Sequence, residues 1–256
     1  MKEKTTGSHH KGRHITLVRH RSQKAHGAWL LARGGTHPNT SQLPALYFTY
    51  VLGSGGHTGE LCEVIKQSFK ATPTLHRRYI VTSGDTYSLA ALAKLENLIH
   101  DVYPGSTAGT WDVYGVTRAR RVHQPFWTAP YTSLLSAISV IEALLRSPEA
   151  RSAPGVKSSF RYPNVIVTNG PGTGFIICLV AHLLRMFWLV PKNQLKIVYI
   201  ETWAHMSTLS LTGKLFYHTS IADIFMVQHK KLADATGTRF VGEVAKSGNL
   251  LGLSTK

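Results

Sequence analysis

The chain has 256 residues, of which 43% are hydrophobic and 16% are charged. This balance suits one sizeable core and excludes a disordered polyelectrolyte. Lys and Arg number 29 against 13 Asp and Glu, so the net charge of +16 favours anionic partners such as phosphates, nucleic acid or an acidic lipid surface. Cys62 and Cys178 lie far apart in sequence, which excludes a disulfide scaffold, gives no zinc motif and indicates a reducing compartment.

The first 45 residues differ in composition from the rest of the chain. They contain eight Lys or Arg against a single acid, Glu3, together with six of the 14 His. Gly, Ser, Thr and Pro interrupt any apolar periodicity, which predicts a mobile basic arm over residues 1–45. A cloning or gene-model artefact is the alternative. The segment has no apolar run typical of a secretory signal.

From residue 46 onward, two kinds of hydrophobic pattern alternate. Short apolar runs predict strands at Leu46–Leu52, Tyr79–Thr82, Asn164–Thr168, Leu195–Glu201 and Ile224–Gln228. Apolar residues at 3-4 spacing predict helices over the segments 61–69, 89–99, 134–145, 175–190 and 207–217. The amphipathic stripe of the third helix consists of Leu134, Ile138, Ile141 and Leu145. Gly- and Pro-rich composition predicts a loop over Tyr103–Gly115 and a linker over Ser147–Ser159.

Strands that alternate with helices imply a parallel sheet covered on both faces. With right-handed connections, the predicted fold class is α/β, a Rossmann-like doubly wound parallel sheet. This domain is expected to span residues 46–245, with a C-terminal tail at 246–256.

The sharpest local feature lies between the first strand and the first helix and reads Gly53-Ser54-Gly55-Gly56-His57-Thr58. Glycines allow a tight turn and a close approach to a ligand, and the N–H groups at a helix start favour an anion. The segment fits neither the dinucleotide fingerprint, which needs glycine where Thr58 stands, nor the P-loop, which needs a lysine. It predicts a phosphate or diphosphate site, with a ligand-free turn as the alternative. Glu60 and Glu63 are placed in the first turns of the helix, where carboxylates are favoured.

His57 is the titratable side chain of this glycine loop. An imidazole at the mouth of a phosphate site is suited to take a proton from a sugar hydroxyl, because histidine ionises near neutral pH. The alternative is a histidine that caps the helix or forms local hydrogen bonds.

A second glycine loop, Asn169-Gly170-Pro171-Gly172-Thr173-Gly174, follows the strand at 164–168. Ligands of open α/β sheets bind beyond the carboxyl ends of the strands. Two glycine loops at the same edge therefore predict a binding site more strongly than either loop alone. The alternative is a turn whose glycines serve only close packing.

Three further features allow a functional and a structural interpretation. Arg118, Arg120 and Arg121 suit bidentate phosphate contacts, or form a solvated basic loop. Glu201 is suited to bind a hydroxyl or a partner's cation, or to cap the helix that follows. The segment 175–190 is apolar nearly all round, so it predicts a buried core helix or one that dips into a membrane surface, and it is too short to cross a bilayer.

Six motifs, taken in chain order, resemble the eukaryotic asparagine-linked glycosylation protein 14 family. They are GSGGHT (53–58), RARRVHQ (118–124), VTNGPGTGFIIC (167–178), VYIETW (198–203), TLSLTGKLFY (208–217) and ADIFMVQ (222–228). The resemblance covers about residues 46–245, and the NGPGTG and LSLTGK blocks are its most specific parts. His205 stands where family members commonly have arginine.

The resemblance implies the acceptor-side half of a split GT-B glycosyltransferase, similar to the N-terminal half of the bacterial transferase that makes lipid II. A separate catalytic subunit, asparagine-linked glycosylation protein 13, would bind UDP-N-acetylglucosamine, and this chain alone would be inactive. Together they would add the second N-acetylglucosamine to N-acetylglucosaminyl-diphosphodolichol at the cytosolic face of the endoplasmic reticulum membrane, to which this subunit recruits its partner. Family members usually begin with a membrane-spanning helix. Here the basic arm and the apolar helix are expected to hold the membrane surface, unless the true N-terminus is missing.

Carried over by position, the resemblance gives roles to individual residues. His57 would lie near the acceptor hydroxyl as a catalytic residue. The acceptor diphosphate would be bound by Gly53, Ser54, Gly55, Gly56, Thr58, Arg121, Asn169, Gly170, Gly172 and Thr173. The membrane or the partner would contact Phe175, Trp188 and Glu201. No metal or cofactor is expected.

Two other function classes stay open. One is an autonomous Rossmann-fold enzyme, either a one-chain glycosyltransferase or an NAD-dependent reductase in which Asp85 binds a ribose. The chain is short for two GT-B domains, however, and the glycine spacing does not match the dinucleotide rule. The other is a nucleic-acid-binding protein, suggested by the charge of +16, although helix-turn-helix, zinc-finger and RNP signatures are not found in the sequence.

Overall fold

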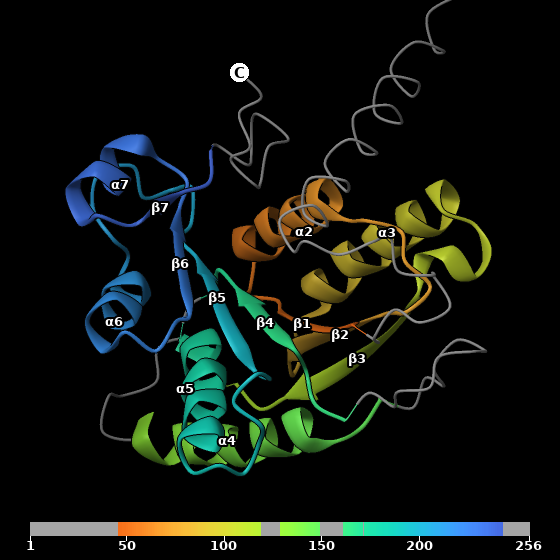
Figure 1. Cartoon of the computed structure of the whole chain (residues 1–256), viewed down its shortest axis with the longest axis horizontal. Helices are drawn as coiled ribbons and strands as arrows, with labels where there is room; N and C mark the ends of the chain where they lie inside the picture. Colours follow the sequence, from red (N-terminus) through yellow and green to blue (C-terminus); the bar gives the residue numbers. More distant parts are fainter. Residues whose placement is uncertain (1–45, 119–128, 149–160, 171, 243–256) are drawn as a thin grey trace, which may run out of the picture. The chain divides into compact units, whose positions relative to one another are not determined.

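The computed structural model describes residues 46–118, 129–148, 161–170 and 172–242 (Figure 1). The strands are β1 (Leu46–Val51), β2 (Leu75–Thr82), β3 (Thr110–Val116), β4 (Val165–Thr168), β5 (Lys196–Ile200), β6 (Ile224–Val227) and β7 (Arg239–Phe240). The helices are α2 (Gly56–Ser68), α3 (Thr86–Val102), the short 3-10 helix η2 (Gly105–Ala108), α4 (Ala129–Leu145), α5 (Gly172–Met186), α6 (Leu211–Thr219) and α7 (Lys230–Thr236). These elements belong to one unit of the chain, Pro44–Lys256.

The seven strands form one sheet in the order β3-β2-β1-β4-β5-β6-β7, and every neighbouring pair is parallel. From the central strand β1 the chain first runs outward to β3, then returns to β4 and continues to β7. The sheet is therefore doubly wound, and its switch point lies between β1 and β4. The predicted fold class is confirmed.

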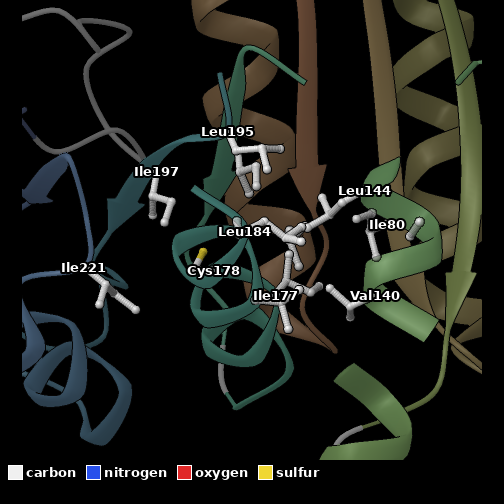
Figure 2. Close-up of a cluster of buried hydrophobic side chains, with 14 of the residues drawn as sticks. Ile80, Val140, Leu144, Ile177, Cys178, Leu184, Leu195, Ile197 and Ile221 are labelled. Carbon is white, nitrogen blue, oxygen red and sulfur yellow. The ribbon is translucent and has the colours of Figure 1, made fainter. Parts of the chain in front are cut away.

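Helices cover the sheet on both faces (Figure 1). The helices α2 and α3 pack over one face, where Leu61, Ile65 and Leu92 belong to a buried apolar cluster. The helices α4 and α5 cover the other face, and Figure 2 shows Val140 of α4 pointing toward Ile177 of α5 within the second cluster. Burial of apolar surface on both faces is the main term that stabilises this layered arrangement.

The prediction of a loop over Tyr103–Gly115 is wrong, because η2 and β3 occupy most of that segment. Edge strand β3 pairs with β2 from His76 to Thr82. Its side chains alternate between more and less exposed positions, as is typical of an edge strand. Gly109 and Gly115 suggested a loop, but Gly109 is needed at a turn with φ of 71°, where an added Cβ would lie 2.1 Å from the carbonyl oxygen of Leu75.

Strand β2 begins four residues before its predicted start, at Leu75. The added residues include Arg77 and Arg78, which are charged and yet fully buried. The Arg77 guanidinium lies 2.8 Å from the Glu96 carboxylate of α3, and that of Arg78 lies 2.6 Å from Asp112 of β3. Such pairing offsets the cost of burying a charge, and it cannot be recognised from an apolar run.

The helix predicted around Leu134–Leu145 is present as α4, but its predicted stripe faces away from the core. Leu134 is 61% and Ile138 is 58% exposed. The core contacts come instead from Val140, Ala143 and Leu144. The predicted stripe is therefore on the surface, and the buried face of α4 includes the smaller residues Val140 and Ala143.

The remaining predicted strands and helices are present, with ends that differ by a few residues. The helix α7 and the short strand β7 extend the sheet beyond the predicted elements. Within the described ranges, no helix combines the length and the apolar content needed to cross a bilayer. The arm at 1–45, the linker core at 149–160 and the tail at 246–256 lie outside the described residues, so the predicted domain boundaries stay predictions.

Candidate functional site

The two glycine loops come together at the switch point of the sheet. One follows β1 and the other follows β4, and these two strands are neighbours. The loops touch, because a Cβ added to Gly170 would lie 3.4 Å from the Cα atom of Gly53. Ligands of doubly wound sheets bind in the crevice beyond this point. The prediction that both loops lie at one edge is therefore confirmed, whereas their ligand is still a prediction.

The first loop leads directly into α2. Gly55 precedes the helix with φ of 63°, a left-handed conformation that suits glycine, and no side chain caps the helix start. Ser54, Gly55 and Gly56 are exposed. An added Cβ on Gly55 or Gly56 would meet no atom within 4 Å. The N-terminal N–H groups of α2 thus begin beside an open surface, which is the geometry that favours an anion.

Thr58 is not part of this open surface. Its side chain is fully buried, and its hydroxyl donates to the carbonyl oxygen of Gly53. The hydroxyl of Ser88 on α3 lies 2.6 Å from that of Thr58 and 3.0 Å from the same Gly53 oxygen. Gly53 itself is buried as well. The hydroxyls of Thr58 and Ser88 therefore stabilise the turn at Gly53. The expectation that the Thr58 side chain lines the diphosphate is corrected.

Asp85 has a structural role at the start of α3. Its carboxylate accepts hydrogen bonds from the Ser88 amide at 3.0 Å and the Ser88 hydroxyl at 2.8 Å, which makes Asp85 the N-cap. Its side chain is buried. This arrangement counts against the ribose contact that an NAD-dependent enzyme would need from it.

His57 is half-buried in the first turn of α2. Its backbone carbonyl accepts a hydrogen bond from Nδ2 of Asn169 at 3.0 Å. Its Nδ1 atom is buried, with no hydrogen-bond partner among the described residues. The backbone of His57 therefore contacts the second glycine loop, and the catalytic role of its imidazole stays a prediction.

The second loop is held by hydrogen bonds between its own residues and β4. The hydroxyl of Thr168 accepts a hydrogen bond from the Gly170 amide at 3.1 Å. It also lies 2.6 Å from where a Cβ on Gly174 would be, so a larger residue at 174 would displace it. Asn169 is buried and joins this loop to α2. Among the loop residues that the structure describes, Gly172 and Thr173 at the start of α5 are the ones that present a surface to solvent.

Glu60 is a residue of this site that the sequence did not identify. It lies on α2 one turn after His57, and its carboxylate accepts hydrogen bonds from four donors. These are Asn169 Nδ2 at 3.2 Å, Thr202 Oγ1 at 2.9 Å, the Trp203 amide at 2.7 Å, and Gln228 Nε2. Because α2 begins at Gly56, Glu60 is beyond the first turn, and the expected interaction with the helix start is wrong. The sequence signal that could have identified Glu60 as a site residue is its position directly after the first glycine loop.

Glu201 is fully buried at the carboxyl end of β5. Its carboxylate accepts hydrogen bonds from the Ser210 amide and hydroxyl, both at 3.1 Å, and from the Thr202 amide at 2.9 Å. Ser210 is the N-cap of α6. Burial and the Glu201 charge raise the pKa of the neighbouring Tyr199, so that its hydroxyl stays protonated and donates to Glu201. Glu201 thus holds Ser210, the residue that caps α6, and its fully buried side chain is not placed to contact a partner or a membrane.

The other predicted contact residues are found in different environments. Phe175 is partly buried and packs edge-on against Phe216, with ring centroids 5.2 Å apart. Trp188 is 74% exposed just after α5. Arg121 lies outside the described residues. In the described ranges, no group of three or more His, Cys, Asp or Glu is arranged to hold a metal ion.

Comparison with known proteins finds one matching family, several similar proteins and a solved structure that resembles this chain. Residues 48–244 match the family described as "Oligosaccharide biosynthesis protein Alg14 like". The chain is similar to the UDP-N-acetylglucosamine transferase subunit alg14 of Schizosaccharomyces pombe, with 34% identity over 181 residues that cover 71% of this chain and 74% of the relative. The Aspergillus fumigatus subunit of the same name is 31% identical over 214 residues, covering 69% of this chain and 92% of the relative. Among solved structures, MurG of Acinetobacter baumannii is 14% identical, with a TM-score of 0.44 over 78% of this chain and 45% of that chain.

Proposed function

Because the chain belongs to the family of Alg14-like oligosaccharide biosynthesis proteins, as its motifs predicted, we propose that it is the acceptor-binding subunit of a UDP-N-acetylglucosamine transferase. The observation that carries the binding role is the pair of glycine loops at the switch point between β1 and β4. This is where the doubly wound fold places its ligands.

The proposed acceptor is N-acetylglucosaminyl-diphosphodolichol, bound through its diphosphate. The exposed surface at Ser54, Gly55 and Gly56 and the surface at Gly172 and Thr173 lie at the starts of α2 and α5. Helix starts favour negative charge through their free N–H groups and the helix dipole. Glycine at these positions allows the lipid diphosphate to approach the backbone closely.

We propose that a second chain completes the enzyme. The relatives are named as transferase subunits, which supports an enzyme of more than one chain. A catalytic subunit of the asparagine-linked glycosylation protein 13 type would bind UDP-N-acetylglucosamine. This chain would present the acceptor hydroxyl beside His57 and would be inactive alone.

The proposed location is the cytosolic face of the endoplasmic reticulum membrane. Support comes from exposed apolar side chains on α4, such as Leu134 and Ile138, and from Phe187, Trp188 and Leu189 just after α5. Trp188 adopts φ of 56°, which is uncommon for a large side chain, and the Lys192 ammonium lies 5.9 Å from its ring. Aromatic and apolar side chains next to a cation suit the headgroup region of a membrane that contains anionic lipids. Recruitment of the partner to the membrane is proposed to follow from this contact.

A transfer assay with separate and combined chains tests the proposal. This chain, the protein 13-type chain and both together receive labelled UDP-N-acetylglucosamine and a lipid-diphosphate-N-acetylglucosamine acceptor. Transfer only by the pair is expected. Transfer by this chain alone would contradict the two-chain division and favour an autonomous enzyme. No transfer by a pair that copurifies would contradict the proposed acceptor.

A further inference from the structure

We propose that Glu60 is the positioning residue of the acceptor site, an inference that rests on the proposed function and assigns a role to a residue outside the glycine loops. Its carboxylate accepts four hydrogen bonds, from Asn169, Thr202, Trp203 and Gln228. An ionised carboxylate offers about four lone-pair positions. The four donors therefore occupy its accepting capacity, and Glu60 acts on a ligand through the loops rather than by direct contact.

The four donors come from three different segments of the carboxyl edge. Asn169 follows β4, Thr202 and Trp203 follow β5, and Gln228 follows β6. Glu60 itself lies on the helix that follows β1. A single side chain thus joins the segments after four neighbouring strands, including the two that flank the switch point.

Asn169 connects Glu60 to His57, the candidate catalytic residue. Its Nδ2 atom donates both to Glu60 at 3.2 Å and to the His57 carbonyl at 3.0 Å. Gln228 likewise donates to Glu60 and, at 2.9 Å, to the carbonyl oxygen of Glu201. Loss of the Glu60 carboxylate would therefore leave Asn169 with only its hydrogen bond to the His57 carbonyl and would loosen the second glycine loop against α2. Displacement of a reacting group by about 1 Å is enough to lower turnover by about 100-fold.

The substitution Glu60→Gln tests this role with little change in size. One acceptor oxygen becomes an NH₂ group, which cannot accept hydrogen bonds from the N–H and O–H donors that face it. At least one of the hydrogen bonds to residue 60 is therefore lost. Glu63→Gln is the matched control, because Glu63 lies on the same helix and its carboxylate accepts hydrogen bonds from Lys66 and Gln67 of that helix, not from the segments after β4, β5 and β6 that donate to Glu60. Thr202→Val serves as a second variant, because it removes one donor and keeps the side-chain shape.

Two measurements on the full chain are compared. The first is amide hydrogen exchange. Glu60→Gln is expected to speed exchange at the hydrogen-bonded amides of Thr58 and Gly170, one in each loop, while the core strands stay protected and Glu63→Gln changes neither. The second is transfer by the two-chain enzyme, for which kcat/KM for the acceptor is expected to fall about 10- to 100-fold while KM for UDP-N-acetylglucosamine stays within about twofold. Thr202→Val is expected to change both measurements in the same direction, by a smaller amount.

The outcomes separate this proposal from the proposed function. Unchanged exchange in the two loops of Glu60→Gln would overturn the positioning role. The positioning role would also be overturned by a second result, in which Glu60→Gln speeds exchange throughout the sheet, the folded fraction keeps its acceptor kinetics, and Thr202→Val has no local effect. Glu60 would then only stabilise the fold. If the wild-type pair transfers no sugar, the proposed function fails, and the exchange measurement still decides whether Glu60 holds the loops.

Discussion

The Glu201 carboxylate occupies the space in which any side chain on residue 213 would begin. A Cβ added to Gly213 would come within 1.8 Å of Glu201 Oε2. Glu201 is fully buried at the end of β5, and its carboxylate accepts hydrogen bonds from the N-cap Ser210. The absence of a side chain at 213 is therefore what allows α6 to begin against β5.

Gly213→Ala is expected to destabilise the fold, because the buried carboxylate would have to move away from its donors. Overpacking of this kind costs about 1–3 kcal/mol of the free energy of unfolding, and disturbed hydrogen bonds add to it. Gly59→Ala is the matched control, since an added Cβ there meets no atom within 4 Å. It should be neutral or stabilise α2 by up to about 1 kcal/mol. Urea unfolding measures both, and equal stability of the two variants would contradict the steric explanation.

Gly172→Leu tests whether the start of α5 contacts the acceptor. An added Cβ meets no atom within 4 Å, so the fold should tolerate the change. If the lipid diphosphate approaches the backbone there, the leucine side chain should weaken acceptor binding by about tenfold or more. Titration with a short-chain lipid diphosphate measures this, with Gly59→Leu as the control. Normal acceptor affinity in Gly172→Leu would remove this loop from the binding site.

His57→Ala is expected to lower turnover of the two-chain enzyme without breaking its assembly. Loss of a general base typically lowers the rate by about 10²- to 10⁴-fold. Single-turnover transfer measures the rate, and copurification with the partner measures assembly. His100→Ala, on the exposed side of α3, is the control. Wild-type turnover in His57→Ala would show that its imidazole is not needed for proton transfer.

Asp112 should make the stability of the protein depend on pH. Burial alone would raise its pKa, but hydrogen bonds from His76 and Arg78 and the Arg78 charge lower the pKa from 3.8 to about 2. Because the folded-state pKa is the lower one, the carboxylate stabilises the fold fully above the unfolded value. This contribution, about 2 kcal/mol, is lost as the pH falls from about 4 to 2.

Asp112→Asn should therefore lose at least about 2 kcal/mol of unfolding free energy at pH 7, and the difference from wild type should be roughly halved at pH 3. Urea unfolding at pH 7, 5 and 3 measures the difference. Asp101→Asn, at an exposed position on α3, is the control. A difference that does not change with pH would show that the ion pair between Arg78 and Asp112 does not alter the pKa of the carboxyl group.

The double substitution Trp188→Ser and Ile138→Ser is expected to weaken membrane association. Both side chains are largely exposed, so the fold should be little affected. Insertion of such side chains contributes about 1.5–3 kcal/mol each when they are fully buried, so binding should fall by about tenfold or more. Co-flotation with anionic phospholipid vesicles measures binding. Leu89→Ser, on the opposite face of the sheet, is the control, and an equal loss in that variant would contradict a specific membrane surface.

Most of the fold follows from local patterns in the sequence. The apolar runs at β1, β4, β5 and β6 and the intervening helical periodicity were sufficient to predict a doubly wound sheet. The patterns did not reveal β3, because an edge strand is half-exposed and contains Gly115. They also missed the start of β2, where Arg77 and Arg78 are buried through ion pairs with residues far along the chain.

Part of the candidate site was likewise predictable. Two glycine loops after two parallel strands indicated a shared edge, and the structure brings Gly53 and Gly170 into contact. The roles of the polar side chains were less predictable. Thr58 and Asn169 point into the protein, whereas Glu60 joins the loops, since these contacts depend on which side of each turn faces the neighbouring segment.

The sequence by itself determined the family, the doubly wound alternation of strands and helices apart from β3, α7 and β7, and the two glycine loops. Hydrophobic periodicity and glycine loops are local properties, so they can be recognised without knowing the fold. The tertiary structure alone decided which face of α4 is buried, that Glu201 binds the N-cap residue of α6, and that Glu60 accepts hydrogen bonds from three separate segments. The contacts of Glu60 join residues more than 100 positions apart, such as Glu60 and Gln228, and packing of the whole sheet brings such residues together.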